Sequence, residues 1–343
     1  MDLRLLGGLT PRDFLHRHWQ KRPLFVRGAL PRFAGVIAEG ALRSLAVRDD
    51  VESRIVERRA ARWETQHGPF SKVKRKDRNW TILVSGVNLH VAAADRLLRR
   101  FHFIPQARLD DVMVSYATPG GGVGPHVDSY DVFLLQGPGR RRWRVGRHTY
   151  VAEPGDMLYV PPGWKHDGVA LEPCYTYSIG FRAPRGAELG AAFLDWLHER
   201  GLPDAVFRDP GRLPVRSPAL IPSQLVEFTN RVVSRISWSK PDLTRFLGEY
   251  LTLPKPHVVF RPGRSRRAPG RARVRLNPKT QLLYRGARFF INGETVNVPP
   301  RAGAALRSLA DRREASGARL ARAGLAELIC GWQRLGYLHL ERP

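Results

Sequence analysis

The pattern of apolar and polar positions changes along the chain. The first hundred residues alternate short apolar and polar groups in a mixed, largely helical pattern. Thr10 followed by Pro11 is typical of a helix start, because threonine caps the first turn and proline fits the first helical position. Phe14, Leu15 and Trp19 then recur at helical spacing. Residues 80–84 are apolar and β-like, and they precede a region with a different pattern.

Between residues 109 and 182 the chain consists of short apolar runs divided by glycine and proline. These runs predict strands, and the glycine- and proline-rich segments between them predict turns. Many short strands at nearly regular spacing indicate a closed β architecture such as a jelly roll. The predicted strands are Asp111–Ala117, Tyr130–Gln136, Arg141–Val145, Met157–Val160 and Thr176–Phe181.

Helical periodicity returns after residue 181. It predicts helices over 187–200, 226–238 and 242–251. Near the C-terminus, Gln281–Tyr284 and Phe289–Ile291 are strand-like, Asn292-Gly293 is a hairpin signal, and two helical stretches follow Pro300. Small strands joined to helices are typical of a winged-helix-like module. We therefore expect a mixed fold with a β-rich domain followed by helices and a small C-terminal domain.

Composition narrows the class of protein. The chain has 343 residues, of which 43% are hydrophobic and 26% charged, which excludes a wholly disordered chain and suggests two or three domains. No apolar run reaches the ~18 residues that span a membrane, so we expect no membrane partner. Two cysteines, Cys174 and Cys330, lie far apart, which favours a reducing cytoplasm over a disulfide scaffold.

The formal net charge is +26. Only eight of the 57 basic residues are lysines, and such a bias toward arginine often reflects the codon usage of a GC-rich genome. The alternative is attraction to a polyanion, with nucleic acid ahead of a membrane. Seven arginines fall within Arg261–Arg275. This segment is either a solvated linker or a contact for RNA.

Three residues predict a metal site. His126 and Asp128 are two positions apart, so on a strand they point to the same face. His166 follows a proline-rich corner that, in a jelly roll, returns the chain beside the first pair. Two imidazoles and one carboxylate form the facial triad suited to non-haem Fe(II), with positions left open for substrate and oxygen.

A buried cation would complete such a site. A 2-oxo diacid such as 2-oxoglutarate chelates the metal at one end and presents a free carboxylate at the other, which a bidentate arginine binds well. Arg141 lies on the strand after Gly137-Pro138-Gly139. Arg142 and Arg144 share the opposite face of that strand. With so many arginines close together, the sequence alone leaves a surface role for Arg141 open.

Several long motifs resemble the bacterial JmjC-type (cupin) ribosomal oxygenases, and the likeness is strongest over about residues 10–186. It is greatest to the arginyl hydroxylases that modify a large-subunit ribosomal protein. The motifs are His18–Pro23, His67–Phe70, Pro119–Phe133, Gln136–Gly146, Pro161–His166 and Tyr177–Pro184.

The resemblance implies a double-stranded β-helix (jelly roll) catalytic domain over 1–186, a helical dimerisation segment over 187–257 and a winged-helix-like domain over 258–343. It implies Fe(II) held by His126, Asp128 and His166, with O2 and 2-oxoglutarate as cosubstrates. Arg141 stands where the family's cosubstrate-binding basic residue lies, and Ser115 is the residue expected to assist it.

The reaction that this resemblance implies is hydroxylation of an arginine β-carbon in a large-subunit ribosomal protein by a cytoplasmic homodimer, with contact to ribosomal RNA as a further expectation. Tyr130, Asp131 and Asp167 are candidates to hold the substrate guanidinium. The alternatives are a cupin-type metal protein of another reaction class and a non-catalytic ribosome- or RNA-binding module. The winged-helix-like end also suggests a DNA-binding regulator, although a fold does not fix a function.

Overall fold

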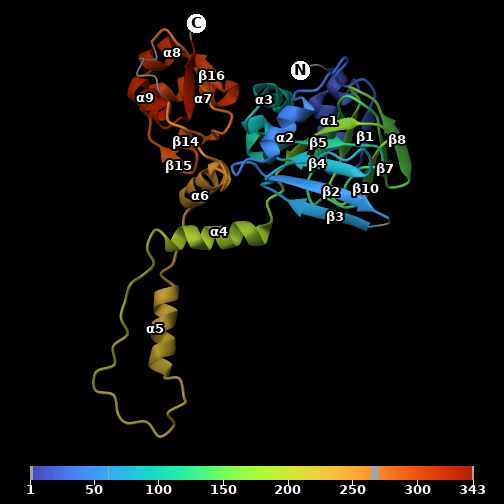
Figure 1. Cartoon of the computed structure of the whole chain (residues 1–343). Helices are drawn as coiled ribbons and strands as arrows, with labels where there is room; N and C mark the ends of the chain where they lie inside the picture. The colour runs from blue at the N-terminus through green and yellow to red at the C-terminus, as the bar shows by residue number, and fades with distance from the viewer. Residues whose placement is uncertain (1–2, 61, 264–269, 342–343) are drawn as a thin grey trace.

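The computed structural model describes residues 3–60, 62–263 and 270–341. An N-terminal jelly roll is followed by a helical segment that extends away from it and by a small C-terminal domain beside the jelly roll (Figure 1). No helix in these ranges is long and apolar enough to cross a bilayer. The division of the chain at residues 186/187 and 257/258 stays a prediction.

The jelly roll is built from an eight-stranded sheet in the order β1-β9-β6-β11-β5-β4-β2-β3 and a three-stranded sheet in the order β10-β7-β8. Every strand pair in both sheets is antiparallel. The strands are β1 (Leu24–Val26), β2 (Ser53–Arg59), β3 (Arg62–His67), β4 (Trp80–Val84), β5 (Leu109–Ala117), β6 (Val132–Gln136), β7 (Arg141–Val145), β8 (His148–Ala152), β9 (Met157–Val160), β10 (His166–Ala170) and β11 (Cys174–Phe181).

The five strands predicted between residues 109 and 182 are confirmed, as is the β-like run at 80–84. The prediction missed β1, β2, β3, β8 and β10. For β3 and β8 the reason is local, since both have few buried residues and carry no apolar alternation. The pairing of β2 and β3 is therefore determined by neighbouring strands and not by a local hydrophobic pattern.

Helices and 3-10 turns cover one side of the large sheet. The helices are α1 (Pro11–Arg17), α2 (Glu39–Ala46) and α3 (Ala92–Leu98), and the 3-10 turns are η1 (Leu3–Leu6), η2 (Val87–Leu89), η3 (Arg99–Phe101) and η4 (Gln106–Arg108). The predicted helix start is confirmed: the Thr10 hydroxyl accepts a hydrogen bond from the Asp13 amide, and Pro11 opens α1. Phe14 of α1 is fully buried and packs against the rings of Phe133 and Tyr159.

The helical segment contains α4 (Gly186–His198), α5 (Ser223–Val233) and α6 (Lys240–Thr252). The helix predicted over 226–238 ends earlier, at Val233, because Ser239 starts a new helix. The Ser239 side chain and Asp242 form a reciprocal capping box at the start of α6. Figure 1 shows α5 and the long connection from α4 projecting away from both domains.

The C-terminal domain is a winged helix with its own core. Its strands are β12 (Arg273–Leu276), β13 (Leu282–Arg285), β14 (Arg288–Ile291), β15 (Glu294–Val296), β16 (Glu314–Ser316) and β17 (Leu338–Glu341). The hairpin predicted at Asn292-Gly293 joins β14 to β15. Three helices follow Pro300 where the pattern indicates two helical stretches: α7 (Gly303–Arg312), α8 (Gly317–Arg322) and α9 (Ala326–Arg334), after a 3-10 turn, η5 (Pro300–Ala302).

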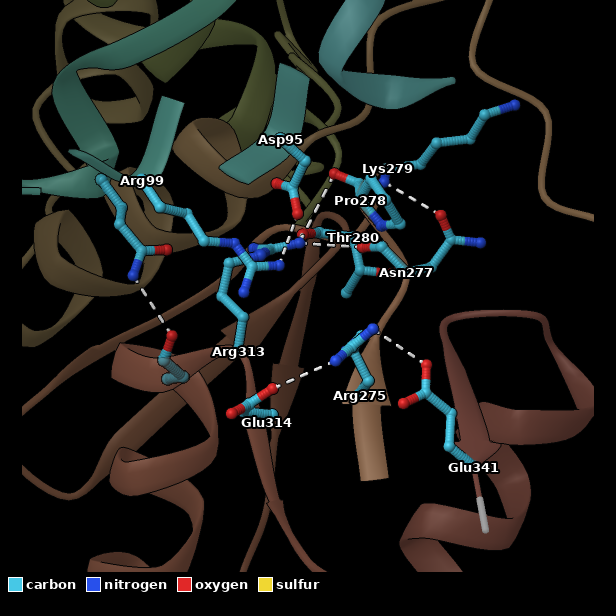
Figure 2. A network of polar contacts seen from close by, with 12 residues as sticks. Asp95, Arg99, Arg275, Asn277, Pro278, Lys279, Thr280, Arg313, Glu314 and Glu341 are labelled. Atoms are coloured by element: carbon cyan, nitrogen blue, oxygen red, sulfur yellow. Dashed lines mark hydrogen bonds and ion pairs between the residues drawn. The ribbon is translucent and has the colours of Figure 1, made fainter. Parts of the chain in front are cut away.

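Part of the arginine-rich segment lies within this domain. Residues 264–269 are outside the described residues, but Arg273 and Arg275 lie on β12, so the segment is not a linker throughout. Both arginines form ion pairs with Glu314, and Arg275 also pairs with Glu341 at 3.0 Å (Figure 2). These two side chains therefore stabilise the sheet of the winged helix.

Arg313 is a buried cation of the winged helix that lies near the jelly roll. It follows α7 with a left-handed backbone, is 5% exposed, and donates to the carbonyl oxygens of Asn277 and Thr280 at 2.8 and 2.9 Å. Figure 2 shows it facing Asp95 of α3, whose carboxylate is paired with Arg99. Burial lowers the pKa of Arg313 to about 10, and the nearby Asp95 charge opposes that shift.

The burial of Phe14 makes a testable prediction. Replacing it with alanine removes a ring from the centre of the aromatic cluster, so Phe14→Ala should lower the free energy of unfolding by about 3–5 kcal/mol. Leu3→Ala, at a position that is 46% exposed, is the control and should cost less than about 1 kcal/mol. Urea denaturation followed by tryptophan fluorescence measures both, and equal losses would contradict this account of the core.

Candidate metal centre and cosubstrate cavity

A cavity of about 640 Å³ opens inside the jelly roll between its two sheets. Its wall combines residues from both sheets with the loop that connects β5 to β6 and with one residue that follows α6. Its polar lining groups include Asp110, Asp111, Ser115, His126, Asp128, Tyr130, Arg141, His166, Thr176 and Lys255. The three predicted metal ligands and the two predicted cosubstrate residues all lie in this one cavity.

The metal-ligand residues meet through backbone pairing of two distant segments. His126 and His166 form an antiparallel bridge, with the His126 amide donating to the His166 carbonyl at 3.0 Å and the reverse bond at 2.9 Å. Earlier in the same loop, Gly120 and Gly121 exchange hydrogen bonds with Ala170 at the other end of β10. The prediction that His126 and Asp128 lie on a strand is wrong, because both belong to a loop that runs beside β10.

The side chains converge as a metal site requires. The Asp128 Oδ2 lies 3.9 Å from the His126 Nε2 and 3.6 Å from the His166 Nε2. One donor atom from each residue lies within 4.8 Å of the others, and this is the one such group of three in the described part of the chain. Two imidazoles and a carboxylate match the donor set that binds Fe(II) and leave coordination positions open.

Backbone carbonyl groups orient both imidazoles. The Nδ1 of His126 lies 2.9 Å from the Gly124 carbonyl, and the Nδ1 of His166 lies 3.0 Å from the Trp164 carbonyl. Because a carbonyl only accepts, each Nδ1 carries the hydrogen and each Nε2 presents its lone pair to the centre. Burial also lowers the pKa of His166, which favours the neutral imidazole that a metal binds.

Arg141 is a buried cation that lies over the ring of Trp143 and forms no ion pair with the described residues. Strand β7 alternates strictly, with Arg141, Trp143 and Val145 buried and Arg142 and Arg144 exposed. Arg141 is 4% exposed, and its Nε and Nη2 lack a hydrogen-bond partner among the described residues. A buried guanidinium in this state is costly unless an anion fills the space in front of it. The cavity therefore fits a ligand with a carboxylate.

Two hydroxyl groups lie on the facing sheet. Ser115 of β5 and Thr176 of β11 are opposite each other in the strand register, and both are nearly fully buried. The Thr176 hydroxyl has no hydrogen-bond partner among the described residues. Sequence analysis singled out Ser115 and missed Thr176, because a threonine within a strand is ordinary and only the register places it beside Ser115.

The three substrate candidates separate in the structure. Tyr130 lines the cavity, and burial together with the negative charge of Asp128 raises its pKa to about 12. Asp131 is fully buried outside the cavity, where the Tyr159 hydroxyl and the Gln20 amide donate to it. Asp167 lies 3.5 Å from Arg144 on the outer face of the small sheet. Of the three, Tyr130 alone is placed to touch a substrate.

An acidic group that the sequence did not reveal lies near Tyr130. Asp111 is 8% exposed and lines the cavity, and its Oδ2 accepts a hydrogen bond from the Gly86 amide at 2.6 Å. Burial raises its pKa to about 6. Its neighbour Asp110 is paired with Lys255 at 3.0 Å, so the segment after α6 closes this side of the cavity. The pattern at 111–117 marks Asp111 only as a strand terminus, since its cavity position depends on three other elements.

Comparisons with known proteins agree with this architecture. Residues 96–152 and 148–189 match the JmjC domain, and residues 235–339 match the ROXA-like winged helix. The chain is 34% identical over 321 residues to ribosomal protein uL16 3-hydroxylase of Escherichia coli, covering 84% of this chain and 86% of that protein. It is also similar to the solved structure of YcfD, a ribosomal oxygenase from Escherichia coli, with 32% identity, a TM-score of 0.83, and coverage of 97% of this chain and 98% of that one.

A further structure of YcfD, with the same identity, coverage and TM-score, is a complex with cobalt and 2-oxoglutarate. The predicted jelly roll and winged helix are confirmed by these matches. The identity and the near-complete coverage of both chains decide the assignment, since they extend over the catalytic and winged-helix regions alike. The chain belongs to the JmjC-domain ribosomal oxygenases, a family of enzymes.

Proposed function

We propose that this protein is an Fe(II)- and 2-oxoglutarate-dependent oxygenase that hydroxylates the β-carbon of an arginine in a large-subunit ribosomal protein. The observation that carries the proposal is a single cavity that holds both a His/Asp/His group and the unpaired, buried Arg141. A relative named as a ribosomal protein uL16 3-hydroxylase supports the substrate class and the position, because carbon 3 of an amino acid is its β-carbon.

The residues have distinct roles in this reaction. His126, Asp128 and His166 would hold Fe(II) through Nε2, Oδ2 and Nε2, the atoms that face the centre. Arg141 would bind the far carboxylate of 2-oxoglutarate, with Ser115 and Thr176 donating from the facing sheet. The bound metal and cosubstrates supply the oxidation that places one oxygen atom of O2 on the substrate and leaves succinate and carbon dioxide.

The remaining cavity wall suits a guanidinium side chain. Asp111 provides a carboxylate that a guanidinium can pair with, and Tyr130 provides a ring for stacking. Asp111 lies on β5, four residues before Ser115 and on the same face of that strand. An arginine that enters along this strand would pass from the acidic group toward the metal centre. The protein thereby orients the side chain and keeps bulk water from the reacting carbon.

The decisive experiment is turnover with a defined control. Protein loaded anaerobically with Fe(II) and 2-oxoglutarate is exposed to oxygen in the presence of purified large-subunit ribosomal proteins. We expect succinate release and a mass increase of one oxygen atom on one protein. His126→Ala removes a ligand and should reduce turnover by at least about 100-fold, since even loss of the groups that orient ligands costs 10–100-fold.

The matched control for this experiment is His148→Ala, an exposed histidine of β8 outside the cavity, which should retain full turnover. Succinate release with no mass change on any ribosomal protein would contradict the proposal that the substrate is a ribosomal protein. The assignment of 2-oxoglutarate as cosubstrate would still hold. Equal succinate release from wild type and His126→Ala would overturn the enzyme itself.

The role of Arg141 makes a separate prediction. Arg141→Ala should raise the dissociation constant of 2-oxoglutarate by about 100-fold, because a buried carboxylate would lose its paired cation. Calorimetric titration of Mn(II)-loaded protein measures this without turnover. Arg142→Ala, on the exposed face of the same strand, should leave the constant unchanged. A similar loss in both variants would show that general positive charge, and not the buried guanidinium, attracts the cosubstrate.

We also propose that α5 and its flanking connections form a homodimer contact. In this segment α5 has no buried residue, and the large apolar side chains Leu220, Ile221, Val226, Val233 and Trp238 are all more than half exposed. An isolated helix of this length is marginal in water, so an apolar face of this kind is stabilised when it packs on a partner. A second copy supplies a matching face by symmetry.

Val226→Asp combined with Val233→Asp tests this contact. Light scattering after gel filtration should show a dimer for the wild type and a monomer for the double variant, because two carboxylates would have to be buried in the interface. Gln224→Asp combined with Asn230→Asp adds the same charge at exposed polar positions of α5 and should remain dimeric. A monomeric wild type would contradict the proposal.

A further inference from the structure

An exposed basic surface lies on the hairpin of β2 and β3 and the loop that follows it. Within residues 58–78 the chain carries eight basic and two acidic residues. All eight basic side chains belong to exposed residues. We call this set the β2–β3 basic surface, and its members are Arg58, Arg59, Arg62, Lys72, Lys74, Arg75, Lys76 and Arg78.

A general arginine bias of the chain does not account for this surface. Three of the eight lysines of the whole chain fall within the five residues 72–76. Some of the charge is internally balanced: Arg59 pairs with Glu57 and Glu64, Lys76 pairs with Glu57, and Arg75 pairs with Glu39 and Asp77.

The other cations of the surface have no acidic partner. In the described ranges no ion pair involves Arg62, Lys72, Lys74 or Arg78. Arg58 instead lies over the ring of Trp63, 5.6 Å from its centroid. Buried Val73 anchors the loop between Lys72 and Lys74, so these two lysines are held at the surface and not on a free tail.

The hairpin that carries part of the β2–β3 basic surface also contributes to the wall of the cosubstrate cavity. Strand β3 is the edge of the large sheet, next to β2 (Figure 1), and Thr65 of β3 lines the cavity. Trp63 packs so closely on the metal-ligand loop that a β-carbon on Gly124 would lie 2.7 Å from its ring. The Gly124 carbonyl is the group that orients His126. The hairpin that carries Arg58, Arg59 and Arg62 therefore also supports the metal-ligand loop.

We propose that the β2–β3 basic surface binds the phosphate backbone of RNA. This inference rests on the proposed function, because a substrate that belongs to an RNA-rich assembly would bring phosphates close to this protein while it is bound. The surface offers unpaired point charges but no apolar pocket, since Trp63 is the one large apolar side chain of β3 and is engaged with the metal-ligand loop. Such a surface suits a sequence-independent polyanion and not the side chains of a peptide.

Neutralising phosphates releases counterions, so binding through this surface must weaken steeply with salt. Each lysine or arginine that contacts a phosphate contributes about one unit to the slope of log affinity against log salt. The same charges would act on the rate of encounter with an RNA-rich particle and leave the chemistry at His126 and Arg141 untouched. The proposal thus predicts a defect that depends on RNA and on salt.

The test uses the full chain and a fluorescently labelled RNA stem-loop. The variant Arg62→Gln/Lys72→Gln/Lys74→Gln removes three cations that have no acidic partner. We expect its affinity for the RNA at low salt to be about tenfold or more weaker, with a salt slope reduced by about 2 to 3. The control Arg285→Gln/Arg319→Gln/Arg322→Gln removes the same charge from exposed positions of the winged helix and should retain both values.

Two outcomes would overturn the proposal. An equal loss in the control variant would mean that RNA responds to net charge and not to this surface. Binding of polyglutamate at the same affinity as the RNA, lost in the same variant, would make the partner an acidic protein. Fluorescence anisotropy at several salt concentrations measures each case.

Turnover separates this inference from the proposed function. The triple variant should hydroxylate a free ribosomal protein at the wild-type rate, because none of its substitutions touches the cavity. Its rate on the same protein bound to ribosomal RNA should fall by about tenfold at low salt. If neither form of the substrate is hydroxylated by the wild type, the proposed function fails, while the RNA-binding measurement still decides the inference on its own.

Discussion

The backbone bridge between His126 and His166 is the constraint on which the catalytic region depends. Two loops that are 40 positions apart in the sequence are joined there by reciprocal hydrogen bonds of 3.0 and 2.9 Å. The bridge fixes the separation of the two imidazoles, and the neighbouring carbonyls of Gly124 and Trp164 fix their orientation. Asp128, two residues beyond the bridge, then completes the donor set. A metal site of this kind is specified mainly by main-chain pairing, which holds before any metal is bound.

The jelly roll also maintains an unmatched charge. Burying the Arg141 guanidinium without an ion-pair partner among the described residues lowers the stability of the fold. The packing of the surrounding strands offsets this unfavourable free energy. Trp143 and the apolar residues of the small core cluster hold β7 in the orientation that points Arg141 inward. In the proposed function this arginine is a preformed anion site, where a carboxylate ligand would gain a charge-assisted contact without requiring the side chain to reorganise. The buried charge of Arg141 thus lowers the stability of the free protein and would strengthen the binding of a carboxylate ligand.

The C-terminal half of the chain contacts the jelly roll near the cavity wall and near α3. Lys255, which follows α6, pairs with Asp110 at the cavity wall, and the charge of Asp95 on α3 acts on the buried Arg313 of the winged helix. Gln106 of the jelly roll donates to the Ala310 carbonyl of the winged helix at 3.2 Å. A winged helix that packs in this way acts as a wall and a support for the jelly roll. Its fold therefore gives no reason to assign it a role in reading DNA.

The sequence predicted the elements whose signals are local. Apolar runs between glycine- and proline-rich turns were sufficient for β5, β6, β7, β9 and β11, and capping residues marked the start of α1. Strand β3 escaped prediction because its residues are mostly exposed and polar, and β2, although mostly buried, carries charged residues among its apolar ones. Strand β2 pairs with both β3 and β4. The helix expected to continue to residue 238 ended at Val233, since the capping box at Ser239 competes for those residues.

The sequence by itself also determined the chemistry, because the spacing of His126 and Asp128, the corner before His166 and the position of Arg141 are properties of the chain. Only the tertiary structure decided which further groups share the cavity. It separated Tyr130 from Asp131 and Asp167, and it brought Thr176 opposite Ser115. The physical reason is that these relations depend on strand register and sheet closure, which join residues far apart in the sequence. Local patterns encode which face a side chain occupies, but not which distant side chain it meets there.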